Sequence, residues 1–365
     1  MSDSWQQSGG VKLLTEFDVP ALVQAQLDAY TLEAIHSQPV MAFDSAAAVD
    51  TLQAHEGKVV IAGDFGGDKG SLLSFSIQSG SLQLTPAYQD KIQGDAGAGY
   101  LDALKHAMAQ AEAQGLPFGL SWGGPLDGAK PVNFAKFATF MHDMRVAGCD
   151  DFRQLSPSLK AVLNDGPAGL ISGAVEAYKR YQATNVLFII NGGGIGLGVL
   201  KGNTIYATEA GHVEAAQALN TYDQTDACGV FGATHVCVER LGANKAGIEA
   251  QWQAEKGSYM RARDIEDQYK AGDAFAAELY DHSALVLAHV LQGSAQALDI
   301  DLASPATVIV GHGGAFKFPS YGNRIGQILQ KHLGSPVQLL MTKDYGDPAS
   351  NACLDGAAIA ALVAD

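Results

Sequence analysis

The feature that most constrains this sequence is an apolar run followed at once by a glycine-rich turn. It occurs three times, with turns at 63–70, 191–198 and 311–314. Glycine allows successive backbone N–H groups to point into one concavity, and such a nest binds anions. Glycine is also in excess overall, with 42 of 365 residues. The pattern predicts a chain whose backbone approaches a ligand closely.

The first turn leaves two interpretations open. It reads Gly63-Asp64-Phe65-Gly66-Gly67-Asp68-Lys69-Gly70. An acidic residue such as Asp64, just before a phosphate nest, can hold Mg²⁺, usually through water. A plain hairpin turn fits equally well, because 71–77 alternates apolar and polar residues and can pair with the strand predicted at 58–61.

The second turn contains the letters G-x-G-x-x-G within Asn191–Gly198. A dinucleotide-binding loop needs a helix to begin there, but Val199-Leu200 and another turn at 201–203 follow. We therefore predict a β-hairpin whose tip wraps a phosphate. In the third turn, His312 stands between glycines and is interpreted as a turn residue rather than a ligand.

The order of elements predicts the fold class. Buried strands are expected at 118–122, 186–190 and 307–310. Helices are expected at 102–114, 166–181 and 274–298, where apolar residues recur at helical spacing or Ala and Leu dominate. Strands that alternate with helices in this way indicate an α/β protein with mixed sheets.

Charge and composition exclude several classes of protein. Lys and Arg total 23 against 39 Asp and Glu, a formal charge of −16. Such a surface repels nucleic-acid phosphates and anionic lipids, so we expect neither as a partner. We see no signal peptide, the apolar runs are too short to span a bilayer, and four cysteines do not make a disulfide scaffold. A cytoplasmic protein is expected.

Residues 1–57 differ from the rest, with one basic residue, Lys12, and eight acidic ones. Helices are expected at 21–35 and 45–55. A DNA-binding arm would need Lys and Arg, so we favour a helical extension packed on the main body.

From residue 58 to 365 the motifs, in their order, resemble the ROK family (repressors, ORFs, kinases) of bacterial sugar kinases. The similar segments are Asp64–Gly67, Trp122–Asp127, Pro131–Asn133, Leu163–Ala168, Gly192–Val199, Glu209–His212 and Asp264–Leu298. The resemblance implies a two-lobed actin-like ATPase (ribonuclease H-like) fold, which clamps ATP. The lobes would be 58–163 plus 346–365 and 164–345, beside the helical extension at 1–57.

The resemblance also implies an ATP-dependent sugar kinase, usually a homodimer. It would transfer the γ-phosphoryl group of Mg·ATP to a hexose such as glucose or an N-acetylhexosamine. Asp165 would be the general base, and the sugar would contact Asn133, Asn164, Asp165, Glu209, His212 and Glu239. The nucleotide and its Mg²⁺ would contact Asp64, Gly66, Gly67, Asp68, Lys69, Gly192, Gly193, Gly194, Gly313 and Gly314. The residues alone leave Asp165 equally open as a helix N-cap, with Pro167 in the first turn.

Two positions depart from the family pattern. Asp68 and Gly193 stand where the family usually has Thr. An ionised Asp cannot donate to a phosphate oxygen as Thr does, so Asp68 would turn away, hold Mg²⁺ or weaken ATP binding. A non-catalytic or weakly active sugar-sensing or regulatory protein therefore remains the alternative.

Many family members bind a structural zinc through a His and three Cys. His212, Cys228 and Cys237 remain here, while Asp226 replaces one Cys and extra residues precede Cys237. Asp226 or His235 can supply the fourth ligand that tetrahedral zinc requires. The alternative is two reduced cysteines in a loop that keeps its shape without metal.

Overall fold

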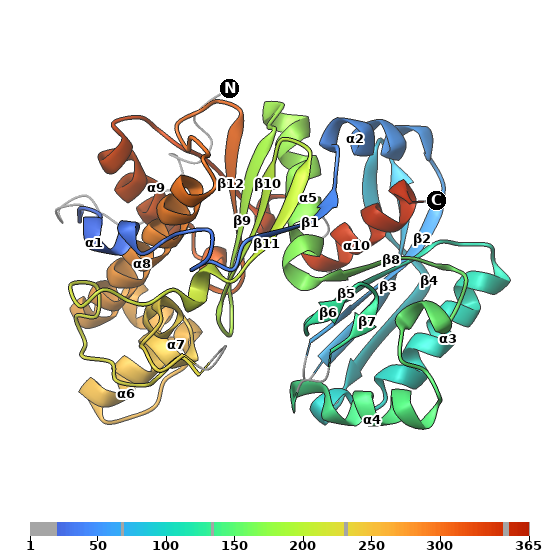
Figure 1. Cartoon of the computed structure of the whole chain (residues 1–365), viewed down its shortest axis with the longest axis horizontal. Coiled ribbons are helices and arrows are strands. Elements are labelled where there is room, and N and C mark those ends of the chain that lie inside the picture. The colour runs from blue at the N-terminus through green and yellow to red at the C-terminus, as the bar shows by residue number, and fades with distance from the viewer. Residues whose placement is uncertain (1–19, 67–68, 133–134, 230–232, 346–349, 365) are drawn as a thin grey trace. The chain divides into compact units, whose positions relative to one another are not determined.

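The computed structural model describes residues 20–364 except 67–68, 133–134, 230–232 and 346–349. The chain divides into two compact units (Figure 1). The first unit comprises 1–38, 189–197 and 208–341, and the second comprises 39–188, 198–207 and 342–365. These boundaries differ from the lobes predicted by resemblance. Each unit takes part of the 1–57 extension, and 164–188 belongs to the second unit.

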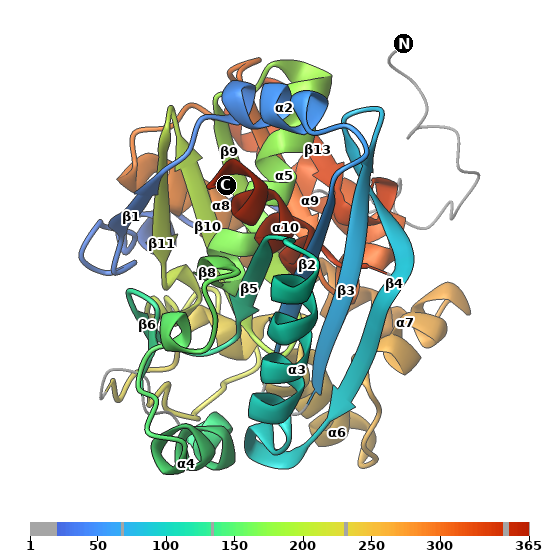
Figure 2. The same cartoon turned by 90° about the vertical axis from the view of Figure 1, so that its right-hand side faces the viewer.

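The second unit contains a five-stranded sheet in the order β4-β3-β2-β5-β8 (Figure 2). β2 (Val59–Phe65), β3 (Lys69–Gln78) and β4 (Ser81–Gln93) pair antiparallel, which confirms the predicted hairpin between 58–61 and 71–77. β5 (Phe118–Trp122) and β8 (Leu159–Asn164) run parallel to β2. A two-stranded ribbon, β6 (Leu126–Asp127) with β7 (Lys130–Pro131), accompanies them.

An aromatic core supports the β2–β5 region of this sheet. Trp122 is 1% exposed, and its ring lies 4.1 Å from Phe137 and 4.6 Å from Phe140, centroid to centroid. α3 (Tyr100–Ala113) contributes buried residues to the same core, and α4 (Ala138–Val146) contributes Phe140. Packing of this density fixes the carboxyl ends of the strands, where the candidate site begins.

Three helices, α2 (Ser45–Ala54), α5 (Asp165–Tyr181) and α10 (Ala352–Val363), pack together in the second unit. The helices predicted at 45–55 and 166–181 are thereby confirmed. A side chain at Gly356 would clash with the Ala168 carbonyl, so glycine permits the close approach of α10 to α5.

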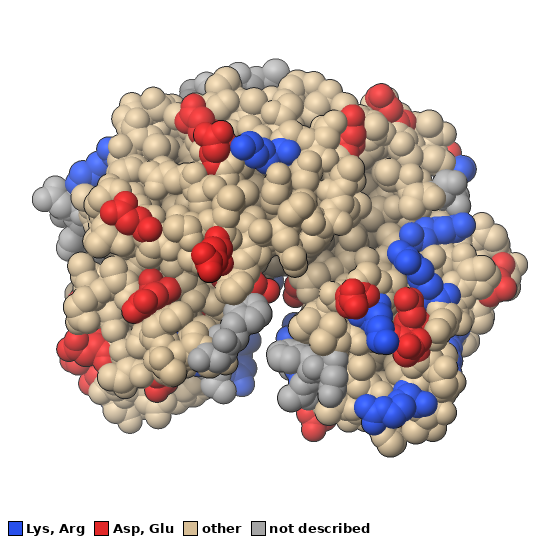
Figure 3. All heavy atoms as spheres, in the orientation of Figure 1, with Lys and Arg blue, Asp and Glu red and all other residues tan. Residues whose placement is uncertain are grey.

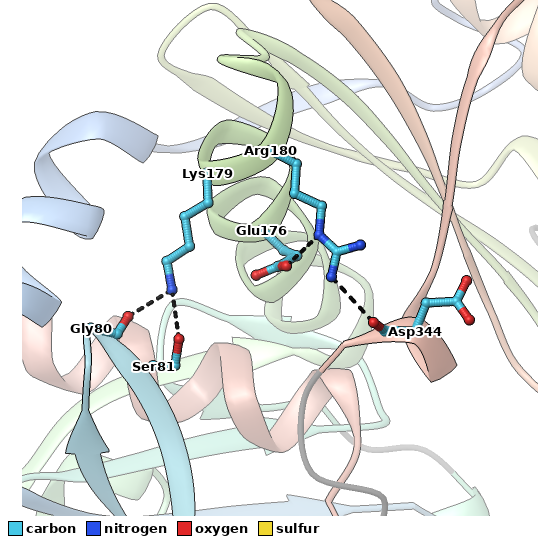
Figure 4. A network of polar contacts seen from close by, with 6 residues as sticks. All are labelled: Gly80, Ser81, Glu176, Lys179, Arg180 and Asp344. Atoms are coloured by element: carbon cyan, nitrogen blue, oxygen red, sulfur yellow. Dashed lines mark hydrogen bonds and ion pairs between the residues drawn. The ribbon is translucent and has the colours of Figure 1, made fainter. Parts of the chain in front are cut away.

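The carboxyl-terminal end of α5 is fastened by polar contacts (Figure 4). The Lys179 ammonium donates to Gly80 O at 2.6 Å and to Ser81 Oγ at 3.1 Å. Arg180 pairs with Glu176 and donates to Asp344 O at 3.2 Å. The helix that begins at Asp165 is therefore tied to the β3–β4 turn at its far end.

A second sheet has six strands in the order β1-β11-β10-β9-β12-β13. The strands are β1 (Gln38–Ala42), β9 (Asn185–Asn191), β10 (Ile195–Lys201), β11 (Thr204–Thr208), β12 (Thr307–His312) and β13 (Gln338–Met341). β9 and β10 are neighbours joined by the glycines at 192–194, as the hairpin prediction requires.

The first unit holds the remaining α-helices. They are α1 (Gln24–Asp28), α6 (Ala250–Lys256), α7 (Ala262–Lys270), α8 (Ala274–Ala297) and α9 (Pro319–Leu333). α8 agrees with the helix predicted at 274–298 and begins where the Asp273 side chain accepts from the Ala276 N–H. The helix predicted at 21–35 is wrong in length, because α1 ends at Asp28 and turns follow.

Among the described residues, no helix combines the length and apolar character needed to cross a membrane. On the face drawn in Figure 3, most of the described Lys and Arg side chains gather at the right of the view, with acidic side chains beside them.

Candidate active site

Strand register in the second unit brings two carboxylates to one edge of the sheet. Asp64, near the end of β2, is opposite Ser121 of β5, and Trp122 of β5 is opposite Asn164, which ends β8. Asp165 follows at once as the first residue of α5. The carboxyl ends of parallel strands meet at this edge, which is where ligands bind in open α/β sheets.

Both oxygens of Asp64 are hydrogen-bonded within the unit. Oδ1 accepts from Ser121 Oγ at 2.7 Å, and Oδ2 accepts from Asn351 Nδ2 at 3.2 Å. Burial raises the pKa of Asp64 to about 6; the two hydrogen bonds oppose this rise and the charge of Asp165 adds to it. Asp64 is therefore held in one orientation, close enough to Asp165 for the two charges to interact.

Asn351 owes its position to helix capping. Its Oδ1 accepts from the N–H groups of Cys353 and Leu354, which makes it the N-cap of α10. The same amide then has its N–H₂ group free to donate to Asp64. Sequence reasoning missed both Ser121 and Asn351, although an Asn before an Ala-rich run is a recognisable cap signal.

The structure resolves the alternatives for the start of α5. Asn164, not Asp165, is the N-cap, and its Oδ1 accepts from the Gly166 N–H at 3.3 Å. Asp165 Oδ1 accepts from the same N–H at 2.9 Å, whereas Oδ2 has no hydrogen-bond donor among the described residues. Burial raises the pKa of Asp165, opposed by the Gly166 N–H and the Lys136 charge.

Asn164, predicted to contact sugar, is engaged within the protein. Its Nδ2 donates to Trp122 O at 3.2 Å and to Gly124 O at 3.0 Å, so it holds the 122–124 turn. Gly123 in that turn has no side chain, and a Cβ there would lie 3.6 Å from Asp165 Oδ2. Glycine at this position allows the turn to approach β2 closely, because a Cβ would lie only 3.0 Å from Phe65 O.

The first glycine turn is described in part. Asp64 lies within β2 and Lys69 begins β3, so the turn is shorter than 63–70. The Gly66 N–H donates to Lys69 O at 2.9 Å, and Gly66 O accepts from Tyr100 Oη at 2.9 Å. Gly67 and Asp68, and the predicted sugar contact Asn133, lie outside the described residues.

In the first unit, the other two glycine turns pack against each other. Gly313 has a φ of +111°, and a side chain there would clash with the backbone of Asn191. Asn191 Nδ2 donates to Tyr321 Oη at 2.9 Å, and Tyr321 Oη lies 2.7 Å from Ser283 Oγ. Asn191, Tyr321 and Ser283 are functional candidates that the sequence pattern did not indicate.

The tip of the second turn is open on one side. Side chains added at Gly192, Gly193 or Gly314 would meet nothing within 4 Å among the described atoms. Gly194 differs, because a side chain there would clash with the Glu239 carboxylate. Glu239 Oε2 accepts from the Ile195 N–H at 3.1 Å, so a hydrogen bond from Glu239 holds the end of this turn.

The three predicted sugar contacts of the first unit lie near one another. Glu209 Oε2 is 3.7 Å from His212 Nε2, across the short turn 210–212. Burial lowers the pKa of His212, and the nearby charge of Glu239 opposes this. Carboxylates beside a neutral imidazole offer the mixture of donors and acceptors that sugar hydroxyls require.

The predicted zinc ligands also come together. Ligand atoms of His212, Cys228 and Cys237 all lie within 4.8 Å of one another, and Cys228 Sγ is 3.4 Å from His212 Nδ1. His235 Nε2 bonds to His212 O at 3.1 Å, and Asp226 is exposed. Three soft or borderline ligands at this spacing fit zinc, which needs one more ligand to complete a tetrahedron.

Several solved structures resemble this fold. A ROK hexokinase from Thermus thermophilus has a TM-score of 0.58 and 21% identity, covering 83% of this chain and 97% of its own. A ROK glucokinase from Streptomyces griseus, in complex with glucose and AMPPNP, has a TM-score of 0.54 and 18% identity. The match covers 83% of this chain and 98% of the glucokinase. A ROK transcriptional regulator homologous to the E. coli MLC protein has a TM-score of 0.54 and 13% identity. The match covers 93% of this chain and 87% of the regulator.

A search of curated protein sequences found no match. The sequence profile of the ROK family, however, matches residues 162–362, more than half of the chain. Mixed sheets covered by helices agree with the α/β, actin-like ATPase fold of the ROK sugar kinases. This chain belongs to the ROK family.

Proposed function

We propose that this protein is an ATP-dependent hexose kinase. It transfers the γ-phosphoryl group of Mg·ATP to a hydroxyl of glucose or of a related hexose or N-acetylhexosamine. The observation that carries the proposal is the half-buried pair Asp64 and Asp165, in which Asp165 Oδ2 has no donor among the described residues. A carboxylate in this environment is suited to accept a proton from a substrate.

In the proposed reaction, the oxygen of the sugar hydroxyl bonds to the γ-phosphorus, and Asp165 Oδ2 accepts the proton that this hydroxyl loses. The bond from the γ-phosphorus to the bridging oxygen breaks, and ADP leaves. Asp64 would hold Mg²⁺, which would neutralise charge on the phosphates. Ser121 and Asn351 keep the Asp64 carboxylate oriented, because each donates to one of its oxygens.

The first unit supplies the binding groups in this proposal. Backbone N–H groups of the turns at 192–194 and 313–314 bind the phosphates. Glu209, His212 and Glu239 bind sugar hydroxyls. Support comes from the glucokinase of Streptomyces griseus, solved with glucose and AMPPNP, and from that of Balamuthia mandrillaris, solved with glucose.

We also propose that His212, Cys228 and Cys237 hold a structural zinc. The spacing of their ligand atoms supports this, and zinc would fix the loop that carries Glu239. Elemental analysis of the purified protein should find one zinc per chain, which Cys237→Ser removes. Protein without stoichiometric zinc, and indifferent to chelators, would favour the metal-free loop.

The match to a transcriptional regulator keeps a sugar-sensing protein as the second candidate. A panel of hexoses with Mg·ATP, followed by ³¹P NMR of the products, separates the two. A kinase converts one or a few hexoses to sugar phosphate and ADP. A sensor binds a hexose, detected by calorimetry, and forms no sugar phosphate.

A further inference from the structure

A buried glutamine near the N-terminus pairs with backbone close to the proposed sugar contacts. Gln26 in α1 is 0% exposed. Its Nε2 donates to Glu214 O at 3.0 Å, and its Oε1 accepts from the Ala216 N–H at 2.6 Å. One side-chain amide thus satisfies both backbone groups along one edge of 214–216, as a neighbouring strand would.

The opposite edge of the same segment pairs with the chain that leads to Glu239. The Ala215 N–H donates to Val236 O at 2.8 Å, and the Val238 N–H donates to Val213 O at 3.0 Å. Residues 213–216 are therefore held between Gln26 on one edge and 236–238 on the other. His212 directly precedes the segment 213–216, and Glu239 directly follows the paired segment 236–238.

Two hydrogen bonds and one packing contact also fix the N-terminal segment at 20–38 to the rest of the first unit. The Glu209 N–H donates to the carbonyl of Ile35, a buried residue, at 2.8 Å. The Val23 N–H donates to Nε2 of the buried His289, in α8, at 2.7 Å. Tyr30 packs where a side chain at Gly293 would clash with its ring. Figure 1 shows α1 beside α8.

We propose that the segment 20–38, which lies outside the part matched by the family profile, is a positioning element for sugar binding. Gln26 and the Ile35 carbonyl hold the backbone at 209–216, and this sets the positions of Glu209, His212 and Glu239. The sugar-binding consequence depends on the proposed function, whereas the bracing of 209–216 does not.

The test compares two glutamines of the same helix. Gln26→Met keeps the length of the side chain but removes the hydrogen bonds of the buried Gln26 amide to Glu214 O and Ala216 N. Gln24→Met is the matched control, because Gln24 is exposed and donates to Asp28 of its own helix. If Gln26→Met fails to fold, Gln26→Glu takes its place, since it keeps the acceptor for Ala216 and loses the donor to Glu214.

The first readout is hydrogen–deuterium exchange, which needs no ligand. In Gln26→Met we expect amides at 209–216 and 236–239 to exchange about tenfold faster, as a lost buried hydrogen bond predicts. Amides of β2 and β5 should be unchanged, and Gln24→Met should match the wild type throughout. Unchanged exchange at 209–216 overturns the bracing role.

The second readout is sugar affinity, measured by calorimetry with the hexose that the wild type binds. Gln26→Met should weaken it about tenfold while the Kd for ATP changes less than twofold. Faster exchange with unaltered sugar affinity, or equal losses for sugar and ATP, overturns the positioning role. If the wild type binds no hexose, the proposed function fails, and the exchange experiment still decides the bracing.

Discussion

The turns after β2 and after β9 follow the same pattern of sequence, yet their surroundings differ. The turn after β2 lies beside two half-buried carboxylates, Asp64 and Asp165, and each oxygen of Asp64 is hydrogen-bonded. The turn after β9 is held by the Asn191 amide, the Tyr321 phenol and the Glu239 carboxylate, and its tip at Gly192 and Gly193 is open. Two turns with similar glycine patterns therefore lie among different side chains.

In the proposed mechanism, the second unit would carry out proton transfer and metal binding, and backbone groups of the first unit would bind phosphate. In the proposed reaction, Asp165 of the second unit would take a proton and Asp64 would attract a cation. Variants in each unit should therefore alter different kinetic constants.

The largest effect is expected at Asp165. Asp165→Asn keeps an acceptor for the Gly166 N–H but removes the base, so kcat should fall by about 10²–10⁴ with the fold intact. Sugar and ATP affinities should change little. Steady-state kinetics with circular dichroism provide the measurement. The matched control is Asp151→Asn, which changes a carboxylate at the start of another helical turn.

A variant with near-normal kcat would remove Asp165 from the mechanism and with it the contrast between the units. An unfolded variant would mean that Asp165 serves mainly to stabilise α5.

Asp64→Asn should lose activity and gain stability. The pKa of Asp64 in the folded protein is about 6, above its ordinary value of 3.8, so folding disfavours the charged form. In the wild type, protonated Asp64 contributes to the free energy of unfolding. This contribution is complete below pH 4 and is lost as the pH rises through 6. At pH 7 the variant should therefore be more stable by up to about 3 kcal/mol.

Urea unfolding at pH 4 and pH 7 provides the measurement for Asp64→Asn. The difference in unfolding free energy between the two pH values should shrink relative to the wild type. The exposed Asp127 serves as control, since Asp127→Asn should leave the difference unchanged. A less stable Asp64→Asn at pH 7 would show that Asp64 is a structural acceptor for Ser121 and Asn351.

Much of the framework was predictable, because it depends on local patterns. Alternating residues gave the β2–β3 hairpin, and helical spacing gave α5 and α8. The partners of the site residues were not predictable, because they are far apart in sequence. Asn351 reaches Asp64 across 287 positions and Tyr321 reaches Asn191 across 130.

At the start of α5 the structure decides an alternative that the sequence left open, and at 21–35 a local prediction failed. The cap of α5 is Asn164, because its amide can accept from the Gly166 N–H and also donate to the 122–124 turn. The helix expected at 21–35 ends at Asp28, and the residues that follow form turns closed by local hydrogen bonds, such as Ile35 N–H to Thr31 O. The Gln26 side chain bonds to the backbone of 214–216, and the Ile35 carbonyl accepts from the Glu209 N–H. Helical periodicity does not reveal these contacts.

Neighbouring glycines sharpen the comparison at the open turn. Gly194→Ala should displace the Glu239 carboxylate from the Ile195 N–H and raise the KM for ATP about tenfold. Gly193→Ala adds the same methyl group to open space and should change the KM less than twofold. Equal effects from the two substitutions would show that the contact with Glu239 does not shape the turn.

The smallest effect is expected at Tyr321. Tyr321→Phe removes the hydroxyl that bonds Asn191 and Ser283, and should raise the KM for ATP about threefold with kcat within twofold. Tyr280→Phe removes a hydroxyl from the same aromatic cluster, where it donates to Ala262 O at 2.7 Å, and should leave the KM unchanged. A fall in kcat without a change in KM would place Tyr321 outside nucleotide binding.

The most direct test of the central claim is a single-turnover experiment with saturating hexose and Mg·ATP. The wild type and Asp165→Asn are each assayed for sugar binding and for formation of sugar phosphate. Both proteins should bind the hexose, and the wild type should convert it within one turnover while the variant does so at least about a hundredfold more slowly. A wild type that binds hexose and ATP but forms no sugar phosphate would contradict the account and identify the protein as a sensor.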